Sequence, residues 1–328
     1  MAALLEIEDF SLAFRTEDGL AHALDRISIR VDENEIMGFV GESGSGKSVT
    51  ALSILGLLPA DRVVRSGRIL YRGTDLLRLG RRAFERLRGR SISMIFQSPG
   101  NSLNPLLRVG DQLEEIIRLH RGMGAAEIRR EAEALLERVE LPSWVLRSYP
   151  HELSGGMQQR ASIAIAISCH PDLLIADEPT SSLDVSIQAQ IIDLLRSLHL
   201  DNAIRAIIFI THDFGLVDAL CDKVTVLYAG QIAESGIAHD VLRRPRHPYT
   251  RGLLAAVPRL DSDGLDIEPI GGTVPGLLDP PLGCRFHPRC RIAVPACARA
   301  YPPVTAIDDT HRVHCHLVHA AATPAGHG

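Results

Sequence analysis

The chain has 328 residues, of which 45% are hydrophobic and 23% are charged, and its formal net charge is −5. These are ordinary globular values, and the length suggests about two domains. The negative charge argues against a protein that coats nucleic acid. No apolar run approaches the roughly 18 residues that a membrane-spanning helix needs. Because no basic region precedes the apolar residues after Met1, we expect no secretory signal and a cytosolic protein.

Residues 3–31 contain short alternating apolar runs, with the turn-forming Glu17-Asp18-Gly19 between them. This alternation predicts two antiparallel strands joined by a hairpin. Phe14 lies in the first of these strands. Its pattern favours a core aromatic, and the alternative is a ring that stacks on an adenine base.

The stretch GESGSGKS, residues 41–48, follows an apolar run at 36–40 and precedes a helix-prone segment at 49–55. Strand, Gly-rich loop, Lys-Ser and helix form the pattern of a phosphate-binding P-loop. Its glycines let backbone N–H groups turn toward one anion, and the helix adds the positive end of its dipole. Lys47 supplies a charge for the β- and γ-phosphates, and the Ser48 hydroxyl can ligate Mg²⁺. A Gly/Ser-rich linker is the alternative, but both flanks favour nucleoside triphosphate binding.

The next segment, residues 63–97, predicts a turn into a strand, an Arg-rich helical stretch and a strand that ends on Gln97. We interpret the arginines as a solvated face. Residues 98–105 are turn-forming. The chain then becomes helical over 109–170. Within it, residues 127–139 repeat apolar side chains at helical period, namely Ile128, Ala132, Leu135, Leu136 and Val139.

Two later segments place polar side chains where a ligand site is expected. Ser154 has helix-capping chemistry before residues 155–160 and a long helix predicted over 161–168. The apolar run 173–176 is typical of a buried parallel strand, and it delivers Asp177 and Glu178 at its carboxyl end. One carboxylate could hold a metal ion while the other activates water, which suits hydrolysis of a γ-phosphate. Two surface acids at a strand end are the alternative.

The remaining pattern predicts a helix over 186–198, a strand over 206–210 that ends at Thr211-His212-Asp213, and strands over 224–227 and 231–234. After about residue 240 the proline density rises and the apolar periodicity fades. We therefore place a domain boundary there.

The stretch LSGGMQQR, residues 153–160, resembles the signature sequence of ATP-binding cassette (ABC) ATPases. GESGSGKS, Gln97, LLIADEP, Ser182-Leu183-Asp184 and His212 occur in that family's order. The resemblance implies an α/β fold: a P-loop NTPase (RecA-like) core with an antiparallel β subdomain, an inserted helical subdomain and a small Cys-containing C-terminal domain. We expect residues 1–240 to form the ATPase domain, with the helical subdomain at about 98–168, and residues 241–328 to form the accessory domain.

The resemblance also implies a role for each motif in a cycle that uses ATP and Mg²⁺. Glu178 would be the catalytic base, His212 would contact the γ-phosphate, and Gln97 would sense the metal and couple to a membrane subunit. Ser48, Gln97 and Asp177 would lie at Mg²⁺. The residues expected at the nucleotide, some of them across a head-to-tail dimer, are Phe14, Gly41, Ser43, Gly44, Ser45, Gly46, Lys47, Ser48, Val49, Ser154, Gly155, Gly156, Gln158, Asp177 and Asp184.

The flanking segments, among them Arg246-His247-Pro248-Tyr249-Thr250, resemble the ATPases of oligopeptide/dipeptide importers. This implies a peripheral protein on the cytoplasmic face of the inner or plasma membrane. Its partners would be two transmembrane permease subunits, a second and related ATPase subunit and, indirectly, an extracytoplasmic binding protein. No nucleic-acid partner is expected. Importers of nickel, glutathione or oligosaccharides are alternatives within the type. A soluble ABC ATPase that acts on DNA or ribosomes, and a cassette that binds ATP without hydrolysing it, are alternatives outside it.

Four of the six cysteines crowd the last fifth of the chain, with five, six and seventeen residues between neighbours: Cys284, Cys290, Cys297 and Cys315. In a reducing compartment this favours a metal site over disulfides. No pair has the tight spacing of most zinc ribbons, whereas the spacings of 4Fe–4S ligands vary. The resemblance favours a 4Fe–4S cluster, and zinc, with His287, His314 or His316, is the alternative. We interpret Cys169 and Cys221 as core residues.

Overall fold

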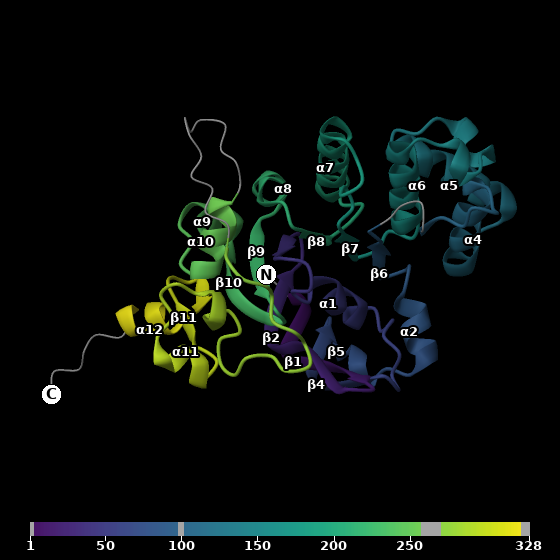
Figure 1. The fold of residues 1–328 in the computed structure, drawn as a ribbon. Coiled ribbons are helices and arrows are strands. Elements are labelled where there is room, and N and C mark those ends of the chain that lie inside the picture. The colour runs from purple at the N-terminus through teal and green to yellow at the C-terminus, as the bar shows by residue number, and fades with distance from the viewer. Residues whose placement is uncertain (1–2, 98–101, 257–269, 323–328) are drawn as a thin grey trace. The chain divides into compact units, whose positions relative to one another are not determined.

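A computed structural model describes residues 3–97, 102–256 and 270–322 of the chain (Figure 1). Two compact units make up the molecule. The first, here the helical unit, comprises Met1–Leu4, Val31–Ile36 and Arg78–Ile210. The second, here the P-loop unit, comprises Leu5–Arg30, Met37–Leu77 and Thr211–Gly328.

Parallel strands form the base of the helical unit. β7 (Leu173–Asp177) lies between β6 (Ile92–Ile95) and β8 (Ala206–Thr211) and pairs parallel with both. Every residue of β7 is buried, because helices cover parallel strands on both faces. The buried parallel strand predicted from the apolar run is confirmed.

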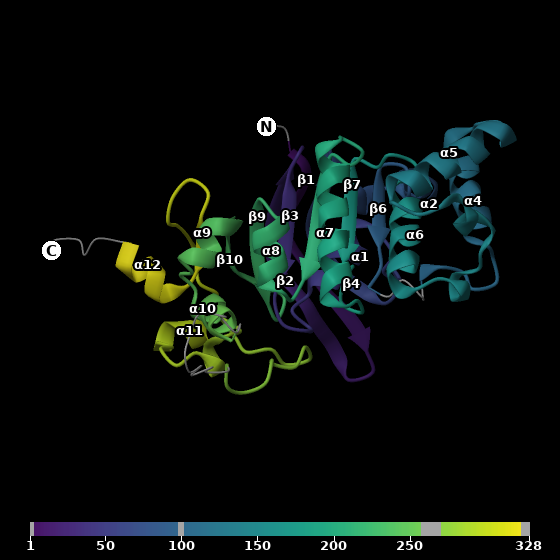
Figure 2. The same cartoon turned by 90° about the horizontal axis from the view of Figure 1, so that it is seen from above.

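Three helices gather at one end of this unit, as Figure 2 shows: α4 (Val109–Arg121), α5 (Ala125–Arg138) and α6 (Gly155–Ile167). The apolar face predicted for residues 127–139 is confirmed, since all five of its members are at most 2% exposed. α2 (Arg81–Leu87) and α7 (Val185–Leu200) complete the longer helices of the unit, with 3₁₀ turns at Ser143–Arg147 and Pro150–Glu152. Residues 98–101 of the predicted turn-rich loop lie outside the described residues.

The arginine-rich stretch is a solvated face, as predicted. Arg81 and Arg82 at the start of α2 are exposed, and Arg88 lies over the ring of Phe84, with its guanidinium carbon 5.0 Å from the ring centre. Phe84 is the one fully buried side chain of α2, while Ala83 and Leu87 are half-buried.

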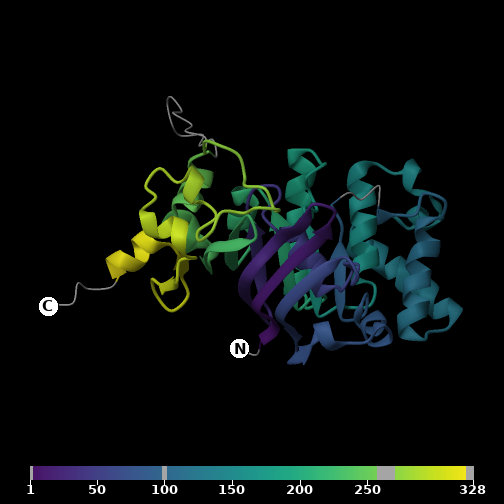
Figure 3. The same cartoon turned by 60° about the horizontal axis from the view of Figure 1, so that its bottom comes forward.

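An antiparallel sheet opens the P-loop unit, visible in purple in Figure 3. Its strand order is β2 (Gly19–Asp32), β1 (Ala3–Thr16), β4 (Val63–Tyr71) and β5 (Thr74–Asp75). β1 and β4 pair from Leu5 opposite Tyr71 to Phe14 opposite Val63. The predicted hairpin of residues 3–31 is confirmed.

A second set of strands in the P-loop unit carries the nucleotide loop. β3 (Ile36–Val40) pairs parallel with β9 (Lys223–Tyr228), and β10 (Gln231–Ile237) pairs antiparallel with β9. Two short strands near the C-terminus, β11 (Val304–Ala306) and β12 (Arg312–His314), extend this set through β10. Its helices are α1 (Lys47–Ile54), α8 (Phe214–Leu220), α9 (Ala238–Arg243), α10 (Pro248–Ala255), α11 (Pro295–Arg299) and α12 (His316–Ala322).

The core of the P-loop unit joins residues from both sides of position 240. Tyr228 of β9 packs edge-on against Tyr249 of α10, with ring centres 4.6 Å apart, and against Phe286, with ring centres 5.1 Å apart. All three rings belong to one buried cluster that also contains Val224 and Val226. The C-terminal segment therefore shares a core with the strands that precede it.

Candidate functional site

The P-loop runs from the end of β3 to the start of α1, and its backbone requires glycine. Gly41 has φ +153°, and a Cβ there would lie 2.1 Å from the Leu227 carbonyl oxygen. Gly46 has φ +102°, and its Cβ would lie 2.7 Å from a methyl carbon of Leu24. At Gly44, with φ +78°, a Cβ would meet no atom within 4 Å, so this part of the loop borders open space. The loop thus has the positive-φ backbone that an anion-binding loop needs, with open space beside Gly44.

Lys47 is folded onto the inside of this loop. Its ammonium donates to the carbonyl oxygens of Gly41, at 2.6 Å, and Glu42, at 3.0 Å, and to the Ser45 hydroxyl, at 3.3 Å. These contacts hold a positive charge beside the glycine backbone. Of the other expected residues here, Ser43 and Ser48 are exposed and Ser45 is buried, while Val49 and Phe14 are half-buried. Phe14 is therefore not a fully enclosed core ring.

In the helical unit, Gln97 and Glu178 meet at the carboxyl ends of two neighbouring strands. The side-chain amide of Gln97 donates to a carboxylate oxygen of Glu178 at 2.8 Å. Glu178 has φ +45°, a left-handed backbone that is uncommon for a residue other than glycine. Asp177, at the last position of β7, is 6% exposed. The two carboxylates are neighbours in the chain but differ in exposure. The buried one, Asp177, suits a metal ligand, and the half-exposed one, Glu178, suits a group that faces water.

The signature segment begins helix α6 with a side-chain cap. The Ser154 hydroxyl accepts a hydrogen bond from the Met157 N–H at 3.3 Å, which confirms the predicted cap. The side-chain amide of Gln158 donates to the carbonyl oxygens of Pro150, at 2.9 Å, and Leu153, at 3.2 Å. Gly156 packs closely on α7, because a Cβ there would lie 3.0 Å from a methyl carbon of Ile187.

The start of α7 repeats this arrangement with an aspartate as the cap. Asp184 accepts from the Ile187 N–H at 3.0 Å and from the Ser186 hydroxyl at 2.7 Å. These hydrogen bonds lower the pKa of Asp184, the one from the Ile187 N–H most of all. The side-chain amide of Gln188 donates to the carbonyl oxygens of Thr180, at 3.1 Å, and Leu183, at 3.0 Å.

Gln188 was not among the residues predicted from the sequence. Its signal is nevertheless present, because Leu-cap-x-x-x-Gln occurs twice, at 153–158 and at 183–188. In both copies the glutamine donates to the carbonyl oxygens one and four residues before the cap. The two loops that precede α6 and α7 are therefore fixed by the same device.

His212 follows the last residue of β8 and is exposed. The next residue, Asp213, turns the chain into α8: its carboxylate accepts from the Gly215 N–H at 2.7 Å, and its own N–H donates to the Thr211 hydroxyl at 3.0 Å. A histidine held directly before such a turn can present an imidazole to a ligand at the strand's carboxyl end.

The four C-terminal cysteines lie in one neighbourhood of the P-loop unit. The Cys284 N–H donates to the Cys297 carbonyl oxygen at 2.9 Å. Burial most of all, with a smaller contribution from the nearby thiols of Cys297, Cys315 and Cys290, raises the pKa of Cys284 to about 12. Among the described residues, however, no group of three or more His, Cys, Asp or Glu side chains is arranged to hold a metal ion. The predicted metal centre has no preformed ligand set.

Within the described ranges, no helix combines the length and apolar character needed to cross a membrane.

Comparisons with known proteins agree with these features. The family described as "ABC transporter" matches residues 24–181, and the family described as "Oligopeptide/dipeptide transporter, C-terminal region" matches residues 233–297. The chain is 45% identical to the dipeptide transport ATP-binding protein DppD of Bacillus subtilis over 97% of this chain and 95% of that protein. It is 48% identical to the oligopeptide transport ATP-binding protein OppD of Salmonella typhimurium over 92% of this chain and 90% of that protein.

Solved structures give the same result for the fold. A dimeric post-hydrolysis state of the ATP-binding cassette MJ0796, bound to ADP and Pi, matches with a TM-score of 0.64 and 26% identity over 71% of this chain and 98% of that one. The cassette cbiO1 of Clostridium perfringens, from the complex cbiONQ, matches with a TM-score of 0.64 and 28% identity over 74% and 92%. The predicted P-loop NTPase fold is confirmed.

Proposed function

Since the chain belongs to the ATP-binding proteins of the oligopeptide/dipeptide ABC transporters, we propose that it hydrolyses ATP to energise peptide import through separate membrane subunits. The observation that carries the proposal is the match over nearly the whole chain, C-terminal region included, to peptide-transport ATPases. The import of nickel, glutathione or oligosaccharides by a transporter of the same type is the alternative.

For the ATP site, we propose that the P-loop holds the phosphates and that Ser48, Gln97 and Asp177 hold Mg²⁺. The open space beside Gly44 and the hydroxyl of Ser48 at the start of α1 fit this use. Bound Mg²⁺ would neutralise charge on the phosphate oxygens. Lys47 would bind the β- and γ-phosphates, and the ring of Phe14 would stack on the adenine of ATP.

For hydrolysis, we propose that Glu178 takes a proton from the attacking water. Gln97, 2.8 Å away, would orient that carboxylate, and His212 would contact the γ-phosphate. Ser154, Gly156 and Asp184 would act across a dimer with a second, related ATPase subunit. Their caps and close packing support this, since they fix the N-termini of α6 and α7.

The substitution Glu178→Gln tests the catalytic assignment. Glutamine has nearly the same shape as glutamate, but its amide cannot act as a base. We therefore expect ATP binding to persist while turnover falls by about 100-fold or more. ATP should then hold the chain and its related ATPase subunit together in a closed dimer, visible by size-exclusion chromatography. Asp193→Asn, an exposed carboxylate of α7, is the matched control. Turnover by the Glu178→Gln variant equal to that of the unmodified chain would refute the assignment.

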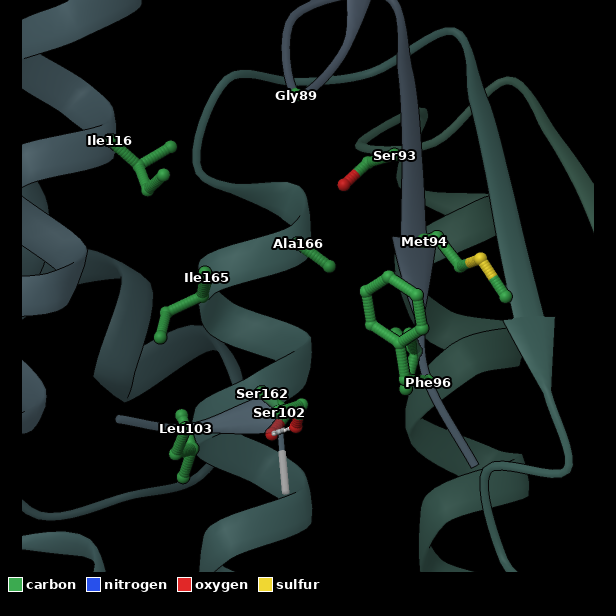
Figure 4. Close-up of a pocket in the computed structure, with 11 residues that line it drawn as sticks. Gly89, Ser93, Met94, Phe96, Ser102, Leu103, Ile116, Ser162, Ile165 and Ala166 are labelled. Carbon is green, nitrogen blue, oxygen red and sulfur yellow. Dashed lines mark hydrogen bonds between the residues drawn. The ribbon is translucent and has the colours of Figure 1, made fainter. Parts of the chain in front are cut away.

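We propose that the chain is peripheral on the cytoplasmic face of the membrane and that two transmembrane permease subunits dock next to Gln97. A cavity of about 140 Å³ lies between β6, α4 and α6 (Figure 4), and Phe96 beside it is 44% exposed. The hydroxyls of Ser102 and Ser162 lie 3.1 Å apart in its wall. An exposed aromatic ring beside a partly apolar cavity fits an apolar segment of a partner.

The transported substrate is tested by uptake into vesicles that contain the whole transporter. Uptake of a labelled tripeptide, compared with uptake of ⁶³Ni²⁺, distinguishes peptide import from nickel import.

For the C-terminal region, residues 241–328, we propose an accessory domain that binds a 4Fe–4S cluster through Cys284, Cys290, Cys297 and Cys315. The support is their sequence spacing and their mutual proximity, not a preformed ligand group. Iron and acid-labile sulfide near four per chain, in protein purified without oxygen, are expected. Zinc without sulfide would show a zinc site in place of the cluster. If neither iron nor zinc is found, both assignments are refuted.

A further inference from the structure

Residue Glu42, second in the P-loop, is held at each of its polar groups. Its N–H donates to the Tyr249 hydroxyl at 2.9 Å, and its carbonyl oxygen accepts from the Lys47 ammonium at 3.0 Å. Its carboxylate accepts two hydrogen bonds from the Arg289 guanidinium, Nη1 to Oε2 at 2.7 Å and Nη2 to Oε1 at 3.1 Å. Such a two-point contact fixes the direction of a carboxylate as well as its distance. Tyr249 and Arg289 both belong to the C-terminal region.

The Arg289 side chain is itself fixed. It is 5% exposed, and it donates to the Tyr228 hydroxyl at 3.1 Å and to the carbonyl oxygens of Gly271, at 2.9 Å, and Ile270, at 3.3 Å. Its guanidinium carbon lies 5.6 Å from the centre of the Tyr228 ring. Because every arm of the guanidinium has an acceptor, Arg289 cannot swing away from Glu42 without the loss of several hydrogen bonds.

Tyr249 brings its hydroxyl to the loop from inside the core. The residue is 0% exposed, and its ring packs against Tyr228 and Phe286, with ring centres 4.6 Å and 5.3 Å away. A hydroxyl on a ring packed in this way has little freedom, so the Glu42 N–H has a fixed acceptor.

We infer that Arg289 and Tyr249 are positioning residues of the ATP site: by holding Glu42 they order the P-loop before nucleotide binds and so set the affinity for ATP. Residues 41–48 are rich in glycine and serine, and such a loop loses much conformational freedom when it is ordered. A loop ordered in advance binds its ligand more tightly because that loss does not accompany binding. The inference rests on ATP binding by the P-loop, and not on the transported substrate or the metal.

The same contact links the cysteine-containing turn to the nucleotide site. Arg289 ends a 3₁₀ turn, in which its N–H donates to the Phe286 carbonyl oxygen at 3.0 Å, and the next N–H, of Cys290, donates to the His287 carbonyl oxygen at 3.2 Å. A change in this turn that moves Arg289 would release the Glu42 carboxylate. The C-terminal region would then act on ATP affinity without touching the nucleotide.

The test compares Arg289→Met, Arg289→Lys and Tyr249→Phe with the unmodified full-length chain. The Kd for a fluorescent ATP analogue, the KM for ATP, kcat and the melting temperature are measured for each. We expect Arg289→Met to raise Kd and KM about tenfold with kcat within about twofold of the unmodified value. Arg289→Lys should recover part of the loss, because it restores the charge without the two-point geometry. Tyr249→Phe should raise Kd about threefold.

Glu42→Gln and the double variant with Arg289→Met separate positioning from general stability. If Arg289 acts through Glu42, the double variant should bind ATP no more weakly than Arg289→Met alone. Arg299→Met, at an exposed arginine of α11, is the control and should bind as the unmodified chain does.

Three results would decide against the inference. The first is an unchanged Kd in Arg289→Met and Tyr249→Phe. The second is a loss of ATP affinity in the double variant that equals the sum of the losses in the two single variants. The third is a loss of ATP affinity that follows the melting temperature in every variant, the control included. If Arg289→Met does not fold, Glu42→Gln and Tyr249→Phe still test the contact from the other side. An unmodified chain that fails to bind ATP would instead refute the proposed function, and this inference with it.

Discussion

At the scale of single residues, the nucleotide loop depends on backbone conformations that only glycine adopts at low cost. Gly44 and Gly46 both have positive φ, but their surroundings differ. Gly44 borders open space, whereas a Cβ on Gly46 would contact the Leu24 side chain at 2.7 Å and the Ala23 carbonyl oxygen at 3.2 Å. Two glycines of one motif therefore have different structural requirements.

The pair Gly44→Ala and Gly46→Ala tests this difference. Gly44→Ala should lower the free energy of unfolding by about 1–2 kcal/mol, the cost of a left-handed backbone with a Cβ. Gly46→Ala should lower it by about 1–3 kcal/mol more, because the methyl group also displaces packed atoms. Urea unfolding of the two variants measures both values. Equal losses would show that the loop relaxes around residue 46.

Glu178 shows a residue-scale feature that no sequence pattern contains. Its φ of +45° is costly for a glutamate, and such conformations persist where surrounding contacts over-determine them. Here the Glu178 N–H donates to the Ile210 carbonyl oxygen at 2.9 Å, and the carboxylate accepts from Gln97. The strained backbone and the side-chain contact together direct the proposed base.

At the scale of elements, α10 begins at a buried polar junction. The carboxylate of Glu234, on β10, is fully buried and accepts from the N–H groups of Arg246, at 2.7 Å, and His247, at 3.0 Å. Its Oε1 also lies 2.7 Å from His311 Nε2. His247 Nδ1 accepts from the Tyr249 N–H at 3.0 Å and so caps α10. The start of the helix that carries Tyr249 thus depends on a neutral His247.

Acid pH should weaken this junction. Burial lowers the pKa of His247 to about 4, against 6.5 for an unperturbed histidine. Between these values the unfolded chain binds a proton that the folded chain does not, so stability falls as the pH falls from about 6.5 to about 4 and then levels off. The contribution is on the order of 3 kcal/mol. His247→Asn, which can still cap the helix, should reduce the slope of unfolding free energy against pH in that range.

The exposed His239→Asn is the matched control for the same pH series, and its slope should equal that of the unmodified chain. If His247→Asn keeps the full slope, His247 does not titrate as its burial requires.

At the scale of the whole molecule, residues before and after 240 contribute to the same hydrophobic cluster of the P-loop unit. β12 also pairs with β10, through Val313 opposite Glu234. The proposed accessory domain, residues 241–328, is therefore part of the structural support of β9, β10 and the P-loop. Figures 1 and 2 both show α9 and α10 beside the yellow C-terminal elements.

A chain cut after residue 240 tests this dependence. It would lose the buried rings of Tyr249 and Phe286, which together contribute about 3–6 kcal/mol. It would also expose Tyr228 and its apolar neighbours to water. We expect a lower urea midpoint and strong binding of a hydrophobic fluorescent dye. A chain of residues 1–240 that unfolds at the midpoint of the full chain would show that the C-terminal region is energetically independent.

The sequence by itself determined the P-loop, the hairpin, the buried strand β7, the apolar face of α5 and the Ser154 cap. Each depends on local rules: glycine conformations, the period of apolar residues and a side chain that reaches the N–H groups of its own helix. The order of the motifs along the chain is also enough to identify the family. The repeated Leu-cap-x-x-x-Gln motif can also be found in the sequence, because its hydrogen bonds join residues close together in the chain.

Only the tertiary structure decided which distant residues meet. Gln97 and Glu178 are 81 residues apart, and Arg289 and Glu42 are 247 residues apart. Such contacts follow from strand register and from the path of the chain between elements, which residue types at short spacing do not specify. The four cysteines also show that a sequence pattern does not determine how residues are placed in three dimensions. Their spacing indicated a metal site, but a ligand set requires three-dimensional placement of thiols, and that is a property of the fold.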